Sequence, residues 1–244
     1  MTRKMLSARV EWIAFLLAAL LCNGAWASGP AAVVTHLSGT LSVVRADGST
    51  RILSVRSEVL EGDILSTARE TYSRVKFNDG AEVVLRPETR FKVDSYRYEA
   101  AKPEEDNFIV SLLKGGMRSV TGLLGARNKE RVSVQTSTAT IGIRGTHFGL
   151  LMCNDDCGNI KTATGQTPSN GLHVDVASGA VSVTNGAGSQ VLSAGQFGYV
   201  ASGNVAPVIA PRSEAVQVTM KESISKNTGS GQAVNTKGDA TCSF

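Results

Sequence analysis

The sequence has few aromatic residues, which make up 5% of its 244 positions, and no long apolar run after its N-terminus. Its net charge of +4 is small, and Lys and Arg are interspersed with Asp and Glu. Such a distribution argues against nucleic-acid binding, which needs a dense basic stripe. The motifs of serine hydrolases, zinc proteases, phosphate-binding loops and dinucleotide-binding folds are also missing. We therefore expect a protein that is not an enzyme and has no catalytic residue, cofactor or metal site.

The first 27 residues have the pattern of a secretory signal peptide. A basic head (residues 3–9) precedes an apolar run (residues 12–21), and small residues lead to a cleavage site after Ala27. The apolar run has about half of the ~20 residues that a membrane span needs. An uncleaved anchor and a lipid attached to Cys22 are the alternatives. The pattern predicts a mature protein that is periplasmic or secreted, without an integral membrane span.

After the leader, apolar and polar residues alternate over short stretches that stop at Gly, Asn or Asp. A period of two is typical of half-buried strands. Asp47-Gly48 and Asp79-Gly80 each stand between two such stretches, and Asp-Gly is a strong hairpin signal because glycine adopts the positive φ that the turn needs. We predict an all-β fold of short antiparallel strands and hairpins, in a β-sandwich or β-solenoid-like body, after the N-terminal signal helix.

Two segments near the ends of the expected β region are similar to each other. SGTLSVVRADGSTRIL begins at Ser38 and SGAVSVTNGAGSQVL begins at Ser178, and one deletion aligns their small, apolar and turn positions. A structural repeat and a chance match both account for this similarity. We expect one continuous β domain over residues 28–211, with a separate β unit at 172–210 as the alternative. Residues 212–244 are polar and are expected to form a flexible tail.

Cys153 and Cys157 bracket a short polar loop in a chain that we expect to be exported. At this spacing the two Cβ atoms can reach disulfide distance across a turn, and an oxidising compartment preserves such a bond. We therefore predict a structural disulfide. A redox pair is the alternative, although such pairs usually have two intervening residues at the start of a helix. Cys242 is then left as a free or intermolecular thiol.

Five segments of the sequence resemble the FecR domain family, over roughly residues 38–150. They are EGDILST (61–67), FNDG (77–80), LRPET (85–89), GGMR (115–118) and TIGIRGTHF (140–148). The resemblance implies an all-β, largely extracytoplasmic domain. In the best-known members this domain is the periplasmic part of a membrane regulator, which relays the occupancy of an outer-membrane siderophore transporter to a cytoplasmic sigma factor. We see no cytoplasmic anti-sigma segment ahead of a membrane helix, so we do not expect direct signalling across the inner membrane.

The last of these segments, TIGIRGTHF, is interpreted as a core strand. Ile141 and Ile143 fall on one face of it and Arg144 falls on the other. Gly145 suits a bulge or the close approach of another backbone. We expect Arg144 to hold the carbonyls of a neighbouring turn or to pair with a carboxylate such as Asp63; an arginine that grips a ligand is the alternative. The motif residues expected to be structural are Gly62, Asp63, Asp79, Gly80, Arg144, Gly145, Thr146 and Phe148.

These observations favour a binding or scaffold module that presents β edges or loops to a protein of the cell envelope, as an accessory to sensing or signalling. The alternative is a surface domain that binds a glycan or an envelope polymer. Aromatic side chains gathered in a groove would favour that alternative, but the four tyrosines are scattered in the sequence.

Overall fold

The computed structural model describes residues 29–220 and residue 224. The predictions for the leader and for the last cysteine therefore concern residues outside the described part. Strands dominate the described chain, and its main helical segments are the short helix α2 (Leu123–Arg127) and the 3-10 turns η1 (Pro103–Glu105) and η2 (Lys129–Arg131). The structure confirms the predicted all-β fold class.

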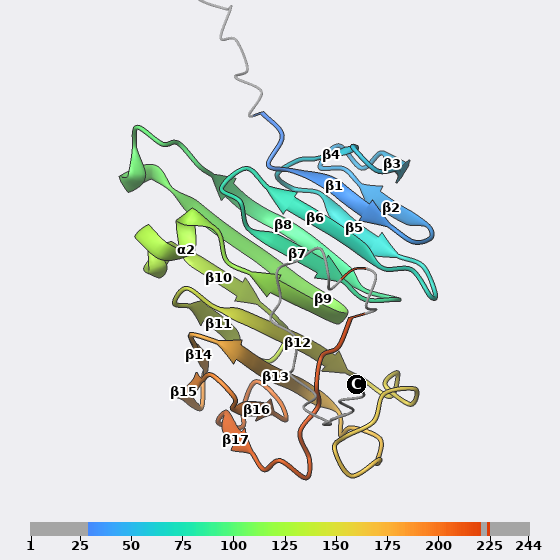
Figure 1. The fold of residues 1–244 in the computed structure, drawn as a ribbon, viewed down its shortest axis with the longest axis vertical. Helices are drawn as coiled ribbons and strands as arrows, with labels where there is room; N and C mark the ends of the chain where they lie inside the picture. The colour runs from blue at the N-terminus through green and yellow to red at the C-terminus, as the bar shows by residue number, and fades with distance from the viewer. Residues whose placement is uncertain (1–28, 221–223, 225–244) are drawn as a thin grey trace, which may run out of the picture.

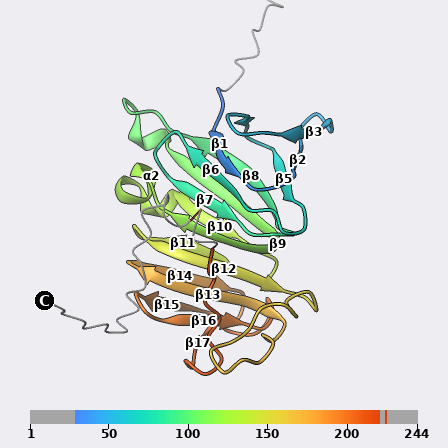
Figure 2. The same cartoon turned by 45° about the vertical axis from the view of Figure 1, so that its right-hand side comes forward.

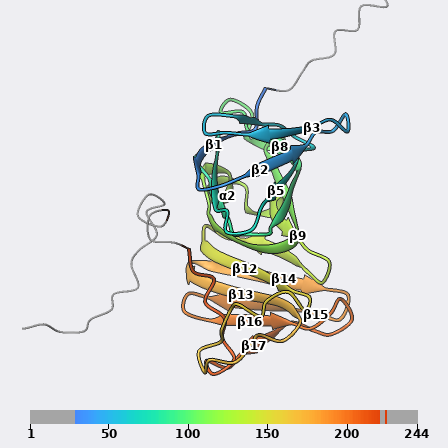
Figure 3. The ribbon, with the colours of Figure 1, turned by 90° about the vertical axis from the view of Figure 1, so that its right-hand side faces the viewer.

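The strands form two sheets that pack face to face and share one long strand, β9 (Figure 1, Figure 3). Strand β10 is parallel to β9, and the other pairings among the described residues are antiparallel. In spatial order, sheet 1 contains β4 (Glu58–Val59), β1 (Ala32–Leu37), β6 (Ser73–Phe77), β7 (Glu82–Leu85), β9 (Asn107–Val120), β12 (His147–Cys153), β13 (Gly171–Ser178), β16 (Phe197–Val200) and β17 (Val208–Ala210). Sheet 2 contains β3 (Thr50–Leu53), β2 (Leu41–Val44), β5 (Ile64–Thr67), β8 (Arg90–Arg97), the first half of β9, β10 (Val132–Gln135), β11 (Thr140–Ile143), β14 (Ala180–Asn185) and β15 (Gly188–Ser193).

Strand β9 belongs to both sheets because the chain changes direction in its middle, at Gly115. Residues 107–114 pair with β8 and β10 in sheet 2, whereas residues 115–120 pair with β7 and β12 in sheet 1. Gly115 has a φ of +78°, and a Cβ at this position would lie 2.6 Å from Oγ1 of Thr89. Both features require glycine. The glycine therefore lets a single strand join the two sheets.

Both predicted hairpins are present. Strand β2 pairs with β3 around Asp47-Gly48, with Leu41 opposite Leu53, and β6 pairs with β7 around Asp79-Gly80. The glycines of the two turns have φ values of +81° and +86°, as the Asp-Gly pattern predicts. Each hairpin buries its inward apolar residues, so sequence alternation and local turn chemistry agree here.

The two similar segments have the same topology, so they form a structural repeat. Strand β1 of sheet 1 leads into the hairpin β2–β3 of sheet 2, and β13 of sheet 1 leads into the hairpin β14–β15 of sheet 2. The register is also the same: Ser42 lies opposite Ile52 in the first copy, and Ser182 lies opposite Val191 in the second. Since β13–β16 continue both sheets, residues 172–210 are part of the same β body.

The hydrophobic core lies between the two sheets. Phe77 of β6 and Phe148 of β12 come from sheet 1, Phe91 of β8 comes from sheet 2, and all three side chains are almost fully buried. Burial of one such side chain stabilises the fold by about 1.5–3 kcal/mol relative to its exposure. Phe77, Tyr96 and Phe108 also form an aromatic cluster, with neighbouring ring centroids 4.6–5.5 Å apart.

The first part of the expected tail packs on the outer face of sheet 1. We call residues 212–220 the C-terminal strap; it crosses β12 and β13 as the orange-red segment of Figure 1. Val216 and Val218 of the strap are buried, at 2% and 1% exposure, and they belong to one apolar cluster with Leu151. The boundary expected at Arg212 is therefore placed too early, because a short apolar alternation, Val-Gln-Val, is enough to bury one face of an extended segment on a sheet.

Candidate functional site

The two aspartates of the predicted motifs stabilise local structure. Oδ2 of Asp63 accepts hydrogen bonds from Nη1 of Arg45 at 2.5 Å and from the Leu60 N–H at 2.7 Å. Oδ2 of Asp79 accepts a hydrogen bond from the Leu124 N–H at 3.2 Å, in the first turn of α2. Burial raises the pKa of both carboxyl groups. The structure thus gives both residues a role in the fold, as the sequence predicts.

The TIGIRGTHF segment forms the corner between β11 in sheet 2 and β12 in sheet 1. Ile141 and Phe148 are fully buried. Gly145 has a φ of +65°, and no atom lies within 4 Å of the place that its Cβ would take, so backbone conformation rather than a close approach requires glycine. The Thr146 N–H donates a hydrogen bond to Oγ1 of Thr121 at 2.9 Å. Positive φ values are also found at Gly62 and Gly80.

Arg144 does not hold the core, contrary to the prediction. Its side chain is exposed and makes no hydrogen bond or ion pair within the described part of the chain. Asp63, the carboxylate considered as its partner, is paired with Arg45. Because Ile143 is the last inward residue of β11, the next side chain points to the outer face of sheet 2, where it lies beside Lys129 in a shallow hollow.

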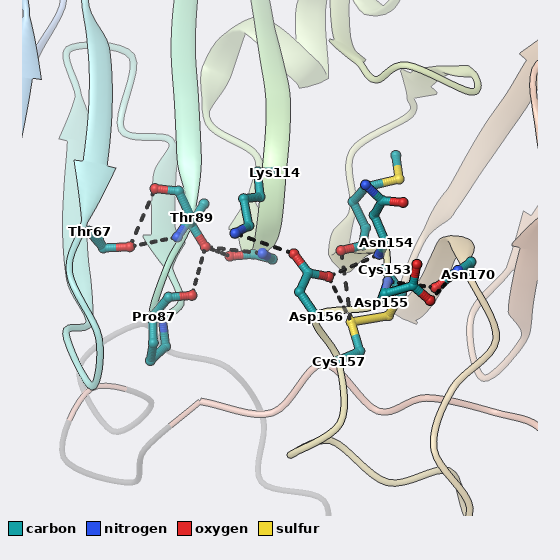
Figure 4. Close-up of polar contacts among 12 residues, drawn as sticks. Thr67, Pro87, Thr89, Lys114, Cys153, Asn154, Asp155, Asp156, Cys157 and Asn170 are labelled. Atoms are coloured by element: carbon teal, nitrogen blue, oxygen red, sulfur yellow. Dashed lines mark hydrogen bonds and ion pairs between the residues drawn. A yellow bond between two sulfur atoms is a disulfide. The ribbon is translucent and has the colours of Figure 1, made fainter.

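The predicted disulfide joins Cys153, at the end of β12, to Cys157 (Figure 4). The loop that it closes is also fixed from outside. The Asp155 N–H donates a hydrogen bond to Oδ1 of Asn170, and Nδ2 of Asn170 donates one back to Oδ1 of Asp155, both at 2.8 Å. The disulfide and this reciprocal pair hold the loop as a rigid rim at one side of the sheets.

An open cleft of about 590 Å³ lies beside this rim, where sheet 2 meets the end of β12. Arg90 of β8 and Lys114 of β9 supply two positive charges to its lining, and Asp156 supplies one negative charge. Nζ of Lys114 lies 3.5 Å from Oδ2 of Asp156, so this ammonium group is shared with the disulfide loop (Figure 4). The Arg90 side chain is exposed and has no partner among the residues that the structure describes.

The lining of the cleft is suited to binding a polar segment with negative charge. Besides the unpaired guanidinium of Arg90, the lining contains the amide groups of Asn154 and Asn170 and the hydroxyl groups of Ser137 and Thr138. A guanidinium binds carboxylates with two parallel hydrogen bonds, which gives both strength and orientation. Within residues 29–220 and 224, no three His, Cys, Asp or Glu side chains gather as they would to hold a metal ion.

A second polar cluster, which the sequence did not reveal, lies under the C-terminal strap. Nε of Arg118 donates a hydrogen bond to Nε2 of His147 at 2.7 Å, and Nη1 donates to Oδ2 of Asp175 and to the Val218 carbonyl, both at 2.8 Å. The Val218 N–H donates to the same Asp175 oxygen at 3.2 Å. Burial and the charge of Arg118 lower the pKa of His147 to about 4, so this imidazole is neutral near pH 7. Arg118, and not Arg144, is thus the arginine that connects separate segments of the fold through hydrogen bonds.

Two sequence signals could have located this cluster. Arg118 ends the GGMR segment that contributes to the family resemblance. The run FGLLMC in β12 is apolar almost throughout instead of alternating, whereas β13 keeps the alternation Leu-His-Val-Asp-Val. A strand with the composition of β12 is covered on both faces, and the strap is the second cover of β12. Gly149 belongs to this signal, because its Cβ would lie 2.6 Å from Cβ of Val218.

Among the described segments, no helix is both long enough and apolar enough to span a bilayer.

Comparison with known proteins gives one family match. Residues 63–182 match the family described as FecR protein, a range that begins and ends later than the 38–150 inferred from motifs. No curated protein matches the chain. A crystal structure of a candidate anti-sigma factor from Parabacteroides distasonis has 19% identity over 63% of this chain and 61% of its own length, with a TM-score of 0.44. A cell surface anchoring domain has 22% identity over 26% of this chain and 83% of its own, with a TM-score of 0.25.

Proposed function

We propose that the protein, whose residues 63–182 match the FecR protein family, is an exported, non-enzymatic binding module that serves signalling at the cell envelope through a protein partner. The family match suggests a signalling-related role. Export rests on the pattern of the leader. N-terminal sequencing of protein from an envelope fraction is expected to begin at Ser28, whereas an intact leader or a lipid on Cys22 would contradict export in soluble form.

The cleft beside the disulfide loop carries this proposal. Arg90 offers an exposed guanidinium without a partner in the described chain, at the mouth of a cleft whose rim is rigid. A preformed site loses little entropy when it binds, so a partner loop meets an oriented surface. The charge of the site favours a partner segment that contains Asp or Glu.

The test compares two exposed arginines of the same chain. The mature protein is used as bait in an envelope extract, as wild type and as the variants Arg90→Glu and Arg144→Glu. Both side chains lie at the surface, so both variants are expected to melt at the wild-type temperature. Arg90→Glu places a negative charge in the cleft and is expected to lose the captured protein, whereas Arg144→Glu is expected to keep it. Capture that survives Arg90→Glu and is lost with Arg144→Glu would overturn the assignment of the cleft.

Three of the four tyrosines give no support to the alternative of glycan binding, which usually depends on exposed aromatic rings. Tyr96 is buried in the core, and the Arg127 guanidinium covers the ring of Tyr98 at 4.8 Å from its centroid. The Tyr199 hydroxyl donates a hydrogen bond to the Asn170 carbonyl. These rings serve the fold, and we therefore favour a protein partner.

A further inference from the structure

The last four strands of the β body lie in a segment that contains no charged side chain. Residues 176–211 include no Asp, Glu, Lys, Arg or His. This segment forms β14, β15, β16 and β17, which lie together at the end of the body opposite β1–β3 (Figure 2). Soluble proteins usually place charges on the open edges of their sheets, because charges prevent edge-to-edge pairing with other chains. Two edge strands without charged side chains, such as β15 and β17, are therefore unusual if these edges face only water.

The same end exposes both open sheet edges together with apolar side chains. Among the described residues, β15 is the last strand of sheet 2 and pairs only with β14, and β17 is the last strand of sheet 1 and pairs only with β16. The exposed apolar side chains at this end are Val191, Val205, Val208 and Ile209, each about half exposed. Their combination with an open strand edge is typical of a surface that pairs with another strand.

The opposite edge of sheet 2 provides an internal comparison, because the repeat places an equivalent hairpin there. Ile52 of β3 occupies the position that Val191 occupies in β15. Ile52 is also exposed, but the same segment contains the exposed charged residues Arg51, Arg56 and Glu58. The two edge strands thus have a β-branched aliphatic residue at the equivalent position, and only the segment of β3 also contains charged residues.

Strand β15 is better suited to pairing than β17. It has six residues and no proline, whereas Pro207 and Pro211 stand on either side of the three-residue strand β17. Proline lacks the N–H that a new ladder needs, so β17 is protected at both ends. A new strand at β15 would replace two side-chain hydrogen bonds of its own protomer, from Nε2 of Gln190 to the Val191 carbonyl at 2.9 Å and from the Ser193 N–H to Oε1 of Gln196 at 2.7 Å.

We propose that a second copy of this chain pairs with β15, so that sheet 2 continues across a two-fold axis from one protomer to its partner. A strand that runs antiparallel to its own copy is self-complementary, which is the requirement for a two-fold dimer. Two copies of β15, neither of which carries a charge, approach each other without repulsion between like charges. A partner that is recognised through its charge would find no charged side chain on this strand. This dimer is separate from the cleft, so it does not depend on the proposed function.

The test measures oligomeric state in matched variants, by sedimentation velocity over a wide range of concentration. The mature chain carries Cys242→Ser throughout, so that no disulfide at that position can mimic a dimer. Unmodified β15 is expected to give a dimer that dissociates on dilution. Val191→Lys introduces a charge at the proposed axis and is expected to give a monomer, whereas Val191→Thr, which keeps a β-branched uncharged side chain, is expected to remain a dimer. Ile52→Lys, at the equivalent position of β3, is the control and is expected to leave the dimer intact.

Hydrogen exchange locates the interface independently. The amides of residues 188–193 are expected to exchange more slowly as concentration rises, while those of residues 50–53 do not change. A monomer at every concentration would overturn the proposal, and so would a dimer that Ile52→Lys dissociates but Val191→Lys does not. Arg90→Glu is expected to remain a dimer, so loss of capture at the cleft and loss of the dimer are distinguishable.

Discussion

Replacement of Arg118 by alanine tests which arginine holds this fold together. The Arg118 side chain connects three separate segments: His147 in β12, Asp175 in β13 and the Val218 carbonyl in the strap. Arg118→Ala removes all three hydrogen bonds at once. It also leaves Asp175 without its cation, although this carboxylate side chain is only 11% exposed.

The expected loss follows from the degree of burial. Breaking a fully buried ion pair costs about 3–5 kcal/mol, because the remaining charge stays buried without a partner, whereas an exposed pair contributes about 0–1 kcal/mol. The Arg118 and Asp175 side chains are 16% and 11% exposed, so the pair lies nearer the buried limit. We therefore expect Arg118→Ala to lower the free energy of unfolding by roughly 2–4 kcal/mol. For a chain of this size, the melting temperature should fall by roughly 5–15 °C.

The assay is thermal and urea unfolding of the mature chain, with Arg144→Ala as the matched control. Arg144 is exposed and unpaired in the described structure, so its replacement is expected to change the free energy of unfolding by less than about 0.5 kcal/mol. Asp175→Asn in both backgrounds completes a double-mutant cycle that isolates the Arg118–Asp175 pair. The reasoning is refuted if Arg144→Ala destabilises the protein as much as Arg118→Ala, or if the cycle shows no coupling.

Three further predictions concern the strap and the loop. The pKa of His147 is lowered to about 4 in the fold, whereas an unfolded histidine takes up a proton near pH 6.5. The wild type should thus lose stability as pH falls from 6.5 towards 4, and His147→Gln should lose less in urea unfolding at pH 7.5 and 4.5; equal losses would contradict this account. Gly149→Val should displace Val218, whose Cβ would lie 2.6 Å from the new Cβ, and hydrogen exchange of the strap amides should accelerate while that of the core does not; an unchanged strap would show that the contact is not needed. Non-reducing peptide mapping should recover Cys153 and Cys157 linked, and their joint replacement by serine should cost about 2 kcal/mol, because the closed loop is short; a Cys153 that alkylates without reductant would disprove the bond.

Much of the fold follows from short-range features of the sequence. The alternation of apolar residues predicts strands, and Asp47-Gly48 and Asp79-Gly80 predict hairpins that the structure contains. The spacing of Cys153 and Cys157 predicts the disulfide. These features depend on residues a few positions apart, and the geometry of a turn or of a pleated strand limits how such residues can be arranged.

The sequence shows that two segments 140 residues apart, beginning at Ser38 and Ser178, share a pattern, but only the strand pairing shows that they repeat the same hairpin. The tertiary structure decided which polar side chains meet. Arg144 and Arg118 are both arginines in family motifs, but β11 ends so that Arg144 points outward, while β9 places Arg118 between β12 and the strap. The partners of Arg118 come from residues 29 to 100 positions away in the chain. No local pattern encodes such contacts, because they exist only after β9 has joined the two sheets and the strap has closed over the outer face of sheet 1.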